Sequence, residues 1–177
     1  MKDLSLNILD IAQNSLKAGA ALIRIALRER DGVLRIVIED DGRGMEPELA
    51  ARVTDPFVTT RDTRKVGLGL PFYRQAAEQT GGSLELVSAP GRGTTVTAVF
   101  HTAHIDAPPA GDMPATIQTL IQGSPDVDFD YSRERDGKVS SLDTRLMREQ
   151  LGDIPLNEPD VLQWIYESLT ESEKELE

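Results

Sequence analysis

Two short stretches of the sequence carry side chains that could bind a ligand. An amphipathic stretch near the start places Asp10, Asn14 and Lys17 along its polar side, since residues three and four apart are neighbours on a helix. Further on, EDDGRGM puts Asp40 before two glycines. A carboxylate at a strand end could accept a hydrogen bond from an exocyclic amine, and the glycines would leave room for a flat ring. Taken alone, each stretch is more typical of a plain surface helix or turn than of a binding site.

A second glycine-containing stretch, VGLGLP at residues 66–71, precedes a helical pattern. The N-terminus of a helix presents unpaired N–H groups and the positive end of the helix dipole, which suits a phosphate. The stretch matches neither the dinucleotide-binding glycine pattern nor a P-loop. Arg61, Arg64 and Lys65 form a basic cluster just before it. We weigh a phosphate-binding role for this cluster against a solvated loop.

Hydrophobic periodicity predicts the elements that must position these residues. The first is a helix that ends near Gly19 and carries Ser15 on its apolar side. The later elements are a hairpin over 22–39 that turns at RDG, a short helix at 46–53, irregular chain over 54–69, a helix from Pro71 to Gly81 and a hairpin over 83–101. Strands that arrive in neighbouring pairs favour a mostly antiparallel sheet. We therefore expect an α+β fold, a two-layer α/β sandwich with helices over one face of the sheet.

The composition changes near residue 104, where IDAPPAGDMPA is rich in proline, alanine and glycine. Trp164, Ile165 and Leu169 lie on a final helix with acidic residues, which could bind a basic partner or pack onto the sheet. The predicted elements here are helices at 114–122 and 143–151, a hairpin over 127–143 and a last helix from about Glu158. We divide the chain into a domain at 1–104, a linker or strap at 105–115 and a small α/β appendage at 116–177.

The composition excludes several classes of function. The 177 residues are 39% hydrophobic, carry a formal net charge of −11 and include no cysteine. Because acidic residues outnumber basic ones so strongly, nucleic acid and anionic membranes would be repelled, and we expect binding to neither. Disulfides and thiolate metal sites are excluded, and no apolar run reaches the roughly 20 residues of a membrane span. With no signal-peptide pattern, we expect a cytoplasmic protein.

Taken in order, the motifs closely resemble one family. The helix with Asp10, Asn14 and Lys17 is followed by DDGRG, DPFVTT, VGLGLP and GRGTTV, over about residues 4–101. This order is similar to the ATP-binding domain shared by histidine kinases, DNA gyrase, the MutL repair proteins and related chaperones, the GHKL superfamily with the Bergerat fold. The stretch from DPFVTT to the last of these motifs most resembles the catalytic domain of histidine kinases.

The resemblance implies ATP and Mg²⁺ as cofactors. Asn14 would bind Mg²⁺ through its amide oxygen, a ligand type that this hard ion prefers, and Lys17 would meet a phosphate. Asp40 would accept a hydrogen bond from the adenine amine, and Thr94 would help to fix Asp40 or the adenine. The family implies a lid that begins at Phe57. Further implied cofactor-binding positions are Gly42, Gly44, Met45, Phe57, Thr60, Arg64, Lys65, Gly67, Leu68, Gly69 and Leu70.

Two positions depart from the family pattern. Asp10 stands where ATP-hydrolysing members carry a general-base glutamate, and a carboxylate there could activate a water. Because aspartate is one methylene shorter, we keep open both a catalytic role and the holding of a water on the metal. Lys65 replaces the first glycine of the G-x-G-x-G that often ends the kinase lid, which adds a cation near the phosphates.

The histidines bear on the type of kinase. His101 and His104 are the only ones, and neither resembles a phosphoacceptor box. We expect a stand-alone domain without a dimerisation or phosphoacceptor domain. Its expected chemistry is that of an ATP-dependent, protein kinase-type phosphotransferase. The leading hypothesis is a Mg-ATP-binding module that acts in trans on an unknown partner protein, by phosphotransfer or regulation, with the appendage as a candidate docking surface. The alternatives are a non-catalytic, ATP-gated binding or assembly subunit and a slow stand-alone ATPase that uses Asp10.

Overall fold

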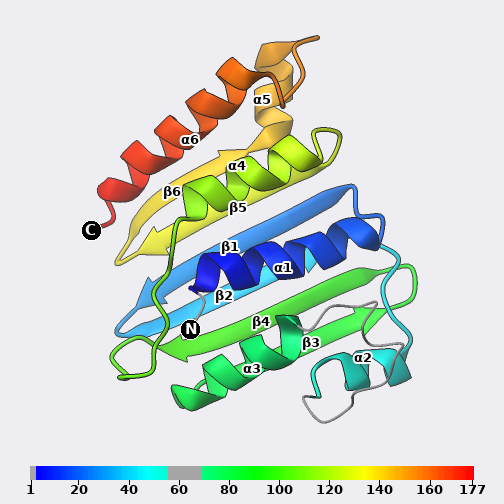
Figure 1. Ribbon diagram of the computed structural model, residues 1–177, viewed down its shortest axis with the longest axis vertical. Helices are drawn as coiled ribbons and strands as arrows, with labels where there is room; N and C mark the ends of the chain where they lie inside the picture. Colours follow the sequence, from blue (N-terminus) through cyan, green and yellow to red (C-terminus); the bar gives the residue numbers. More distant parts are fainter. Residues whose placement is uncertain (1–2, 56–68) are drawn as a thin grey trace.

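The computed structural model describes residues 3–55 and 69–177, which form an α+β fold (Figure 1). Its six strands form one sheet in the order β3-β4-β2-β1-β5-β6, and every neighbouring pair except β1 with β5 is antiparallel. In chain order the elements of the described residues are α1 (Leu4–Lys17), β1 (Leu22–Arg30), β2 (Val33–Asp40), α2 (Pro47–Val53), α3 (Gly69–Gln79), β3 (Ser83–Ala89), β4 (Gly93–His101), α4 (Met113–Gly123), β5 (Asp128–Arg135), β6 (Lys138–Asp143), α5 (Thr144–Leu151) and α6 (Pro159–Lys174).

One face of the sheet is covered by helices, and Figure 1 shows α1, α3, α4 and α6 lying over it. Strand alternation produces this arrangement, because residues two apart point to the same face. In β1, Ile23 and Ile25 are buried while Arg24 between them is exposed. Ile117 of α4 and Ile165 of α6 are buried in the same core cluster. The predicted two-layer α+β architecture, mostly antiparallel with helices on one face, is confirmed.

Two of the hairpins turn at an aspartate–glycine pair. Asp31 and Gly32 have φ values of 53° and 75°, and Asp136 and Gly137 have φ values of 49° and 86°. Positive φ at both central residues matches the twist of the flanking strands, and aspartate and glycine adopt it more readily than other residues. The sequence-predicted hairpins over 22–39 and 127–143 are therefore confirmed.

The chain between β4 and α4 runs back to the start of α1. The carbonyl of Pro109 accepts from the Leu4 N–H and that of Ala110 accepts from the Ser5 N–H, both at 2.9 Å. Asp3 adds a side-chain cap by accepting from the Leu6 N–H at 3.1 Å. These acceptors satisfy N–H groups that the first turn of a helix leaves unpaired. The stretch thus has the character of an ordered strap.

The structure differs from the sequence expectations at two helices. α3 begins at Gly69 and not at Pro71, because proline is tolerated in the first turn of a helix. In α6, Ile165 and Leu169 are buried in the core, so they are not available to a partner as one of our hypotheses supposed. Trp164 remains 54% exposed. The alternative, that this helix packs onto the sheet, is the one that the structure supports.

The C-terminal third is continuous with the rest of the sheet. β5 pairs with β1 in parallel from Leu22 opposite Asp128 to Glu29 opposite Arg135. The division at 104 and 116 therefore does not coincide with a break between sheets, and it stays a prediction about domain organisation. Among the described residues, no helix combines the length and apolar character that crossing a bilayer requires.

Candidate functional site

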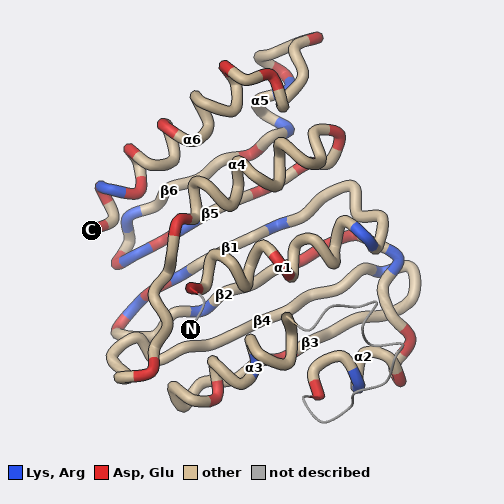
Figure 2. The backbone as a smooth tube through the Cα atoms, viewed as in Figure 1, with Lys and Arg blue, Asp and Glu red and all other residues tan. Residues whose placement is uncertain are grey.

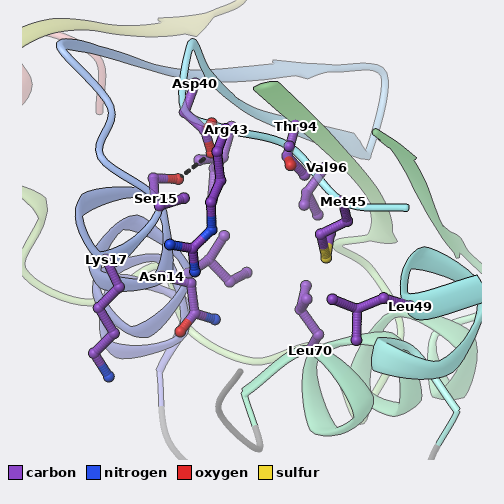
Figure 3. Close-up of a pocket in the computed structure, with 14 residues that line it drawn as sticks. Asn14, Ser15, Lys17, Asp40, Arg43, Met45, Leu49, Leu70, Thr94 and Val96 are labelled. Atoms are coloured by element: carbon purple, nitrogen blue, oxygen red, sulfur yellow. Dashed lines mark hydrogen bonds between the residues drawn. The ribbon is translucent and has the colours of Figure 1, made fainter. Parts of the chain in front are cut away.

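A pocket opens between α1, the end of β2, α2, α3 and β4 (Figure 3). Its volume is about 110 Å³, well beyond the space that a single buried water needs. The apolar part of its wall is formed by Ile11, Ile38, Met45, Leu49, Leu70 and Val96. Its polar part is formed by Asn14, Ser15, Lys17, Asp40, Arg43 and Thr94. An apolar cleft with a few converging polar groups is the usual form of a small-molecule site.

The Asp40 side chain lies in the wall of this pocket and is held in place by hydrogen bonds. It is the last residue of β2 and only 8% exposed. Its Oδ2 accepts from the Ser15 hydroxyl at 2.6 Å, and its Oδ1 accepts from the Gly42 N–H at 2.9 Å. Figure 3 shows this Ser15 bond reaching across from α1. A buried carboxylate needs such donors, and here they also set its direction.

The glycine loop after Asp40 is held by close backbone contacts. The Arg43 N–H donates to the Ala18 carbonyl at 2.9 Å, and the Arg43 carbonyl accepts from the Gly91 N–H at 2.7 Å. Gly44 has a φ of 71°, and a Cβ there would lie 1.9 Å from the Ala89 carbonyl oxygen. A side chain at this position is therefore excluded by neighbouring backbone. The loop packs tightly between the end of α1 and the β3–β4 turn.

Three polar side chains lie on one side of the pocket. Asn14 and Lys17 come from α1 and Arg43 from the glycine loop, and Figure 3 shows the Arg43 guanidinium directed toward Asn14. Within residues 3–55 and 69–177, no hydrogen bond or ion pair engages these three side chains. In the described part of the chain, Lys17 and Arg43 thus have no carboxylate partner, although the net charge of the chain is −11. They create a local positive potential that suits an anionic group.

Asn14 fits a role as a ligand of Mg²⁺. Its amide lies in the pocket wall, and an amide oxygen is a suitable ligand for this hard ion. In the described part of the chain, no cluster of three or more acidic or histidine side chains forms a metal cage. An ion at this place would therefore take few ligands from the protein, as Mg²⁺ does when it is bound together with phosphates.

Asp10 and the start of α3 lie against each other. A Cβ added at Gly69 would be 3.2 Å from the Cβ of Asp10, so α1 and the first turn of α3 are in close contact. Asp10 itself is not among the residues that line the pocket, whereas Leu70 is. The remaining predicted positions of the lid and the glycine stretch, Phe57, Thr60, Arg61, Arg64, Lys65, Gly67 and Leu68, lie outside the described residues.

Thr94 lines the pocket, but among the described residues no hydrogen bond joins its hydroxyl to the Asp40 carboxylate. The two residues are paired across β2 and β4, and the Thr94 hydroxyl shares a hydrogen bond of 2.8 Å with the Ser88 hydroxyl. Asp40 is instead held by Ser15 and Gly42. Of the two alternatives we gave for Thr94, a contact with the base is the one that this geometry leaves open.

Sequence reasoning missed two polar residues of this site. The helical period puts Ser15 on the apolar side of the first helix, where a hydroxyl among apolar residues is the signal for a buried hydrogen bond. Arg43 stands inside the DDGRGM stretch, whose pattern by itself indicates a role only for Asp40 and the glycines. Both are placed by contacts between segments distant in sequence, Ser15 with Asp40 and Arg43 with Ala18 and Gly91.

Comparison with known proteins identifies a family for more than half of the chain. Residues 2–104, more than half of the chain, match the family described as histidine kinase-, DNA gyrase B-, and HSP90-like ATPase. The chain is 38% identical to the sensor protein kinase FleS of Pseudomonas aeruginosa over 95 residues, 52% of this chain and 23% of that protein. It is 33% identical to the histidine protein kinase DivJ of Caulobacter vibrioides over 96 residues, 51% of this chain and 16% of that protein.

A third relative is a probable C4-dicarboxylate sensor kinase of Bacillus subtilis, 36% identical over 78 residues, 44% of this chain and 15% of that protein. The chain spans less than a quarter of the length of each of these relatives. The resemblance read from the motifs is confirmed: the chain belongs to the family of histidine kinase-, DNA gyrase B- and HSP90-like ATPases, and it is homologous to the catalytic domains of histidine kinases.

Proposed function

We propose that this chain binds Mg-ATP in the Asp40 pocket and acts in trans on a partner protein, by phosphotransfer or by regulation. The observation that carries the proposal is the fixed carboxylate of Asp40, which receives hydrogen bonds from Ser15 and Gly42 at 2.6 and 2.9 Å. Each oxygen of a carboxylate has more than one acceptor direction, so Asp40 can still accept from an adenine amine.

The two ends of the pocket suit the two ends of the nucleotide. The adenine would lie between the apolar wall and Asp40, near Thr94, which Figure 3 shows on the side of the pocket away from Asn14 and Lys17. Lys17 and Arg43 would then meet the phosphates, because both cations lie on the same side as Asn14. Bound Mg²⁺, with Asn14 as a ligand, would neutralise phosphate charge.

Titration calorimetry of the full chain tests the binding step. We expect Mg-dependent uptake of ATP and a loss of affinity of about 10- to 150-fold in Asp40→Asn, which corresponds to about 1.5–3 kcal/mol for a hydrogen bond to a charged group. Asp31→Asn is the matched control, since Asp31 lies in an exposed turn. Equal affinities of the wild type and Asp40→Asn would refute the adenine contact.

A variant of Arg43 distinguishes binding of the phosphates from binding of the adenine base. Arg43→Ala should weaken ATP by about tenfold or more but leave adenosine affinity unchanged, because only ATP carries phosphates for the cation to bind. Arg35→Ala removes an exposed arginine that alternates with the buried residues of β2, and it serves as the control. A parallel loss for ATP and adenosine would place Arg43 at the base or in the fold.

The transfer step needs its own test. Incubation with γ-labelled ATP and a co-purifying partner should label that partner if phosphate is transferred. Label on neither protein would favour the alternative, an ATP-gated binding or assembly subunit. That alternative gains support from Asp10, which lies against Gly69 and is shorter than a general-base glutamate. The third hypothesis, slow ATPase activity, predicts that Asp10→Asn lowers steady-state phosphate release.

A further inference from the structure

A groove between α5 and α6 is lined by apolar side chains, of which Trp164 is exposed to water and Met147, Leu151 and Val161 are partly buried. Its volume is about 320 Å³. Trp164 is 54% exposed, and Leu146 on α5 is 59% exposed. Exposed apolar side chains that gather at one place mark an interaction surface more often than scattered ones do. Figure 1 places α5 and α6 beyond β5, away from α3.

Trp164 is not required by the packing of α6 on the sheet. The side of this helix that packs into the core is formed by Leu162, Ile165 and Leu169, which are nearly fully buried. Trp164 directly precedes Ile165, and consecutive helical residues are rotated by about 100°. α6 therefore has a second apolar position outside the core, and that position lines the groove.

The surroundings of the groove are acidic. Residues 149–173 contain seven aspartates and glutamates and no lysine or arginine. On α6, Asp160, Glu167 and Glu171 stand four residues before and three and seven residues after Trp164, which puts them on the same side of the helix. Figure 2 shows acidic positions recurring along α6 and a basic position only near its C-terminal end.

The arginines of α5 do not neutralise this surface. Arg145 is hydrogen-bonded to Asp143 at 2.8 Å, and Arg148 is hydrogen-bonded to Asp128 at 2.8 Å. Both guanidinium groups are therefore already paired with carboxylates of the sheet. The potential over the groove stays negative and would attract a cationic segment.

We propose that this groove docks an amphipathic helix of a partner protein, with apolar anchors between Met147 and Trp164 and lysines or arginines facing the acidic side of α6. Helices dock into apolar grooves through anchors three, four and seven residues apart. A second copy of this chain is disfavoured, since two such grooves would face each other with like charge. This inference rests on the part of the proposed function in which the chain acts on a partner protein. It adds which kind of segment of that partner would bind, an amphipathic helix with basic residues.

The single tryptophan of the chain makes the test direct. The reagent is a synthetic helical peptide without aromatic residues, with leucines at i, i+4 and i+7 and flanking lysines. We expect a saturable blue shift of Trp164 emission, and at least a threefold weaker affinity when salt is raised from about 50 to about 300 mM. Two control peptides, one with the leucines shuffled out of helical register and one with glutamate for lysine, should give no shift.

Variants of the groove give a second readout by calorimetry. Asp160→Asn combined with Glu167→Gln should weaken the peptide about tenfold and reduce its salt dependence, while Trp164→Ser should weaken it by at least tenfold. Matched controls are Glu85→Gln for charge and Val87→Ser for an exposed apolar side chain, both on β3. Neither control should change the affinity.

The outcomes that overturn the inference are distinct from failure of ATP binding. The inference fails if Trp164 emission does not move, if shuffled and acidic peptides bind equally, or if the groove variants bind like the wild type. It also fails if ultracentrifugation shows that the chain self-associates through Trp164. Titration of the same samples with Mg-ATP measures the ATP affinity of the Asp40 pocket separately.

Discussion

Removing the Ser15 hydroxyl is the most specific perturbation of the candidate site. Ser15 and Asp40 are 4% and 8% exposed, and the hydroxyl donates to Oδ2 at 2.6 Å. In Ser15→Ala, the Asp40 carboxylate keeps only the Gly42 N–H as a donor within the described residues. A hydrogen bond to a charged group contributes about 1.5–3 kcal/mol. We expect the free energy of unfolding to fall by this amount, which lowers Tm by about 3–12 °C for a chain of this size.

The same change should also weaken nucleotide binding. Without Ser15, the Asp40 side chain must be ordered when adenine binds, at a cost of about 0.5–1.5 kcal/mol for one immobilised side chain. This corresponds to a loss of about two- to tenfold in ATP affinity. The loss should therefore be smaller than in Asp40→Asn, which changes the acceptor itself.

Urea unfolding of a double-mutant cycle measures the coupling of the pair. In an Asp40→Ala background, Ser15→Ala should cost little, because its partner is already gone. Ser168→Ala in α6 is the matched control for the gain in helix propensity, since no hydrogen bond to the Ser168 hydroxyl is found in the described part of the chain. A change below about 0.5 kcal/mol for Ser15→Ala, with additive single effects, would refute our reasoning.

Three further variants test the loop and the start of α5. Gly44→Ala should prevent stable folding, because its Cβ would lie 1.9 Å from the Ala89 oxygen; thermal unfolding and soluble yield report this. Gly19→Ala, at a φ of 76° with open space around it, should cost only about 1–2 kcal/mol, and equal effects would contradict the packing argument. The hydrogen bond from the Arg145 guanidinium lowers the pKa of Asp143. Since this pKa is depressed by folding, the stability it provides is present above the usual pKa of about 3.9 and is lost as pH falls through the lowered value. Asp143→Asn should therefore flatten the loss of stability below about pH 5, measured by urea unfolding from pH 7 to 3.

The motifs alone were sufficient to predict the fold class and the location of the pocket. Asp40 follows a strand with strict alternation, and the Asp31-Gly32 pair marks the turn before it. Asn14 and Lys17 share one side of a helix because of a local 3.6-residue period. These features depend on neighbours along the chain, so one sequence is enough to predict them.

Other features depended on contacts between distant segments. Ser15 is the donor to Asp40 only because α1 packs across the end of β2, 25 residues along the chain. The parallel pairing of β5 with β1 follows from no local pattern. Trp164 stays exposed because Ile165 and Leu169 already fill the core side of α6. The sequence by itself determined the helices and hairpins and the places of Asn14, Lys17 and Asp40 on them, since local periods and turns encode both. The tertiary structure alone decided which buried donor fixes Asp40, which cation reaches the pocket and which side of the last helix stays open, because packing chooses among faces that the local sequence leaves equivalent.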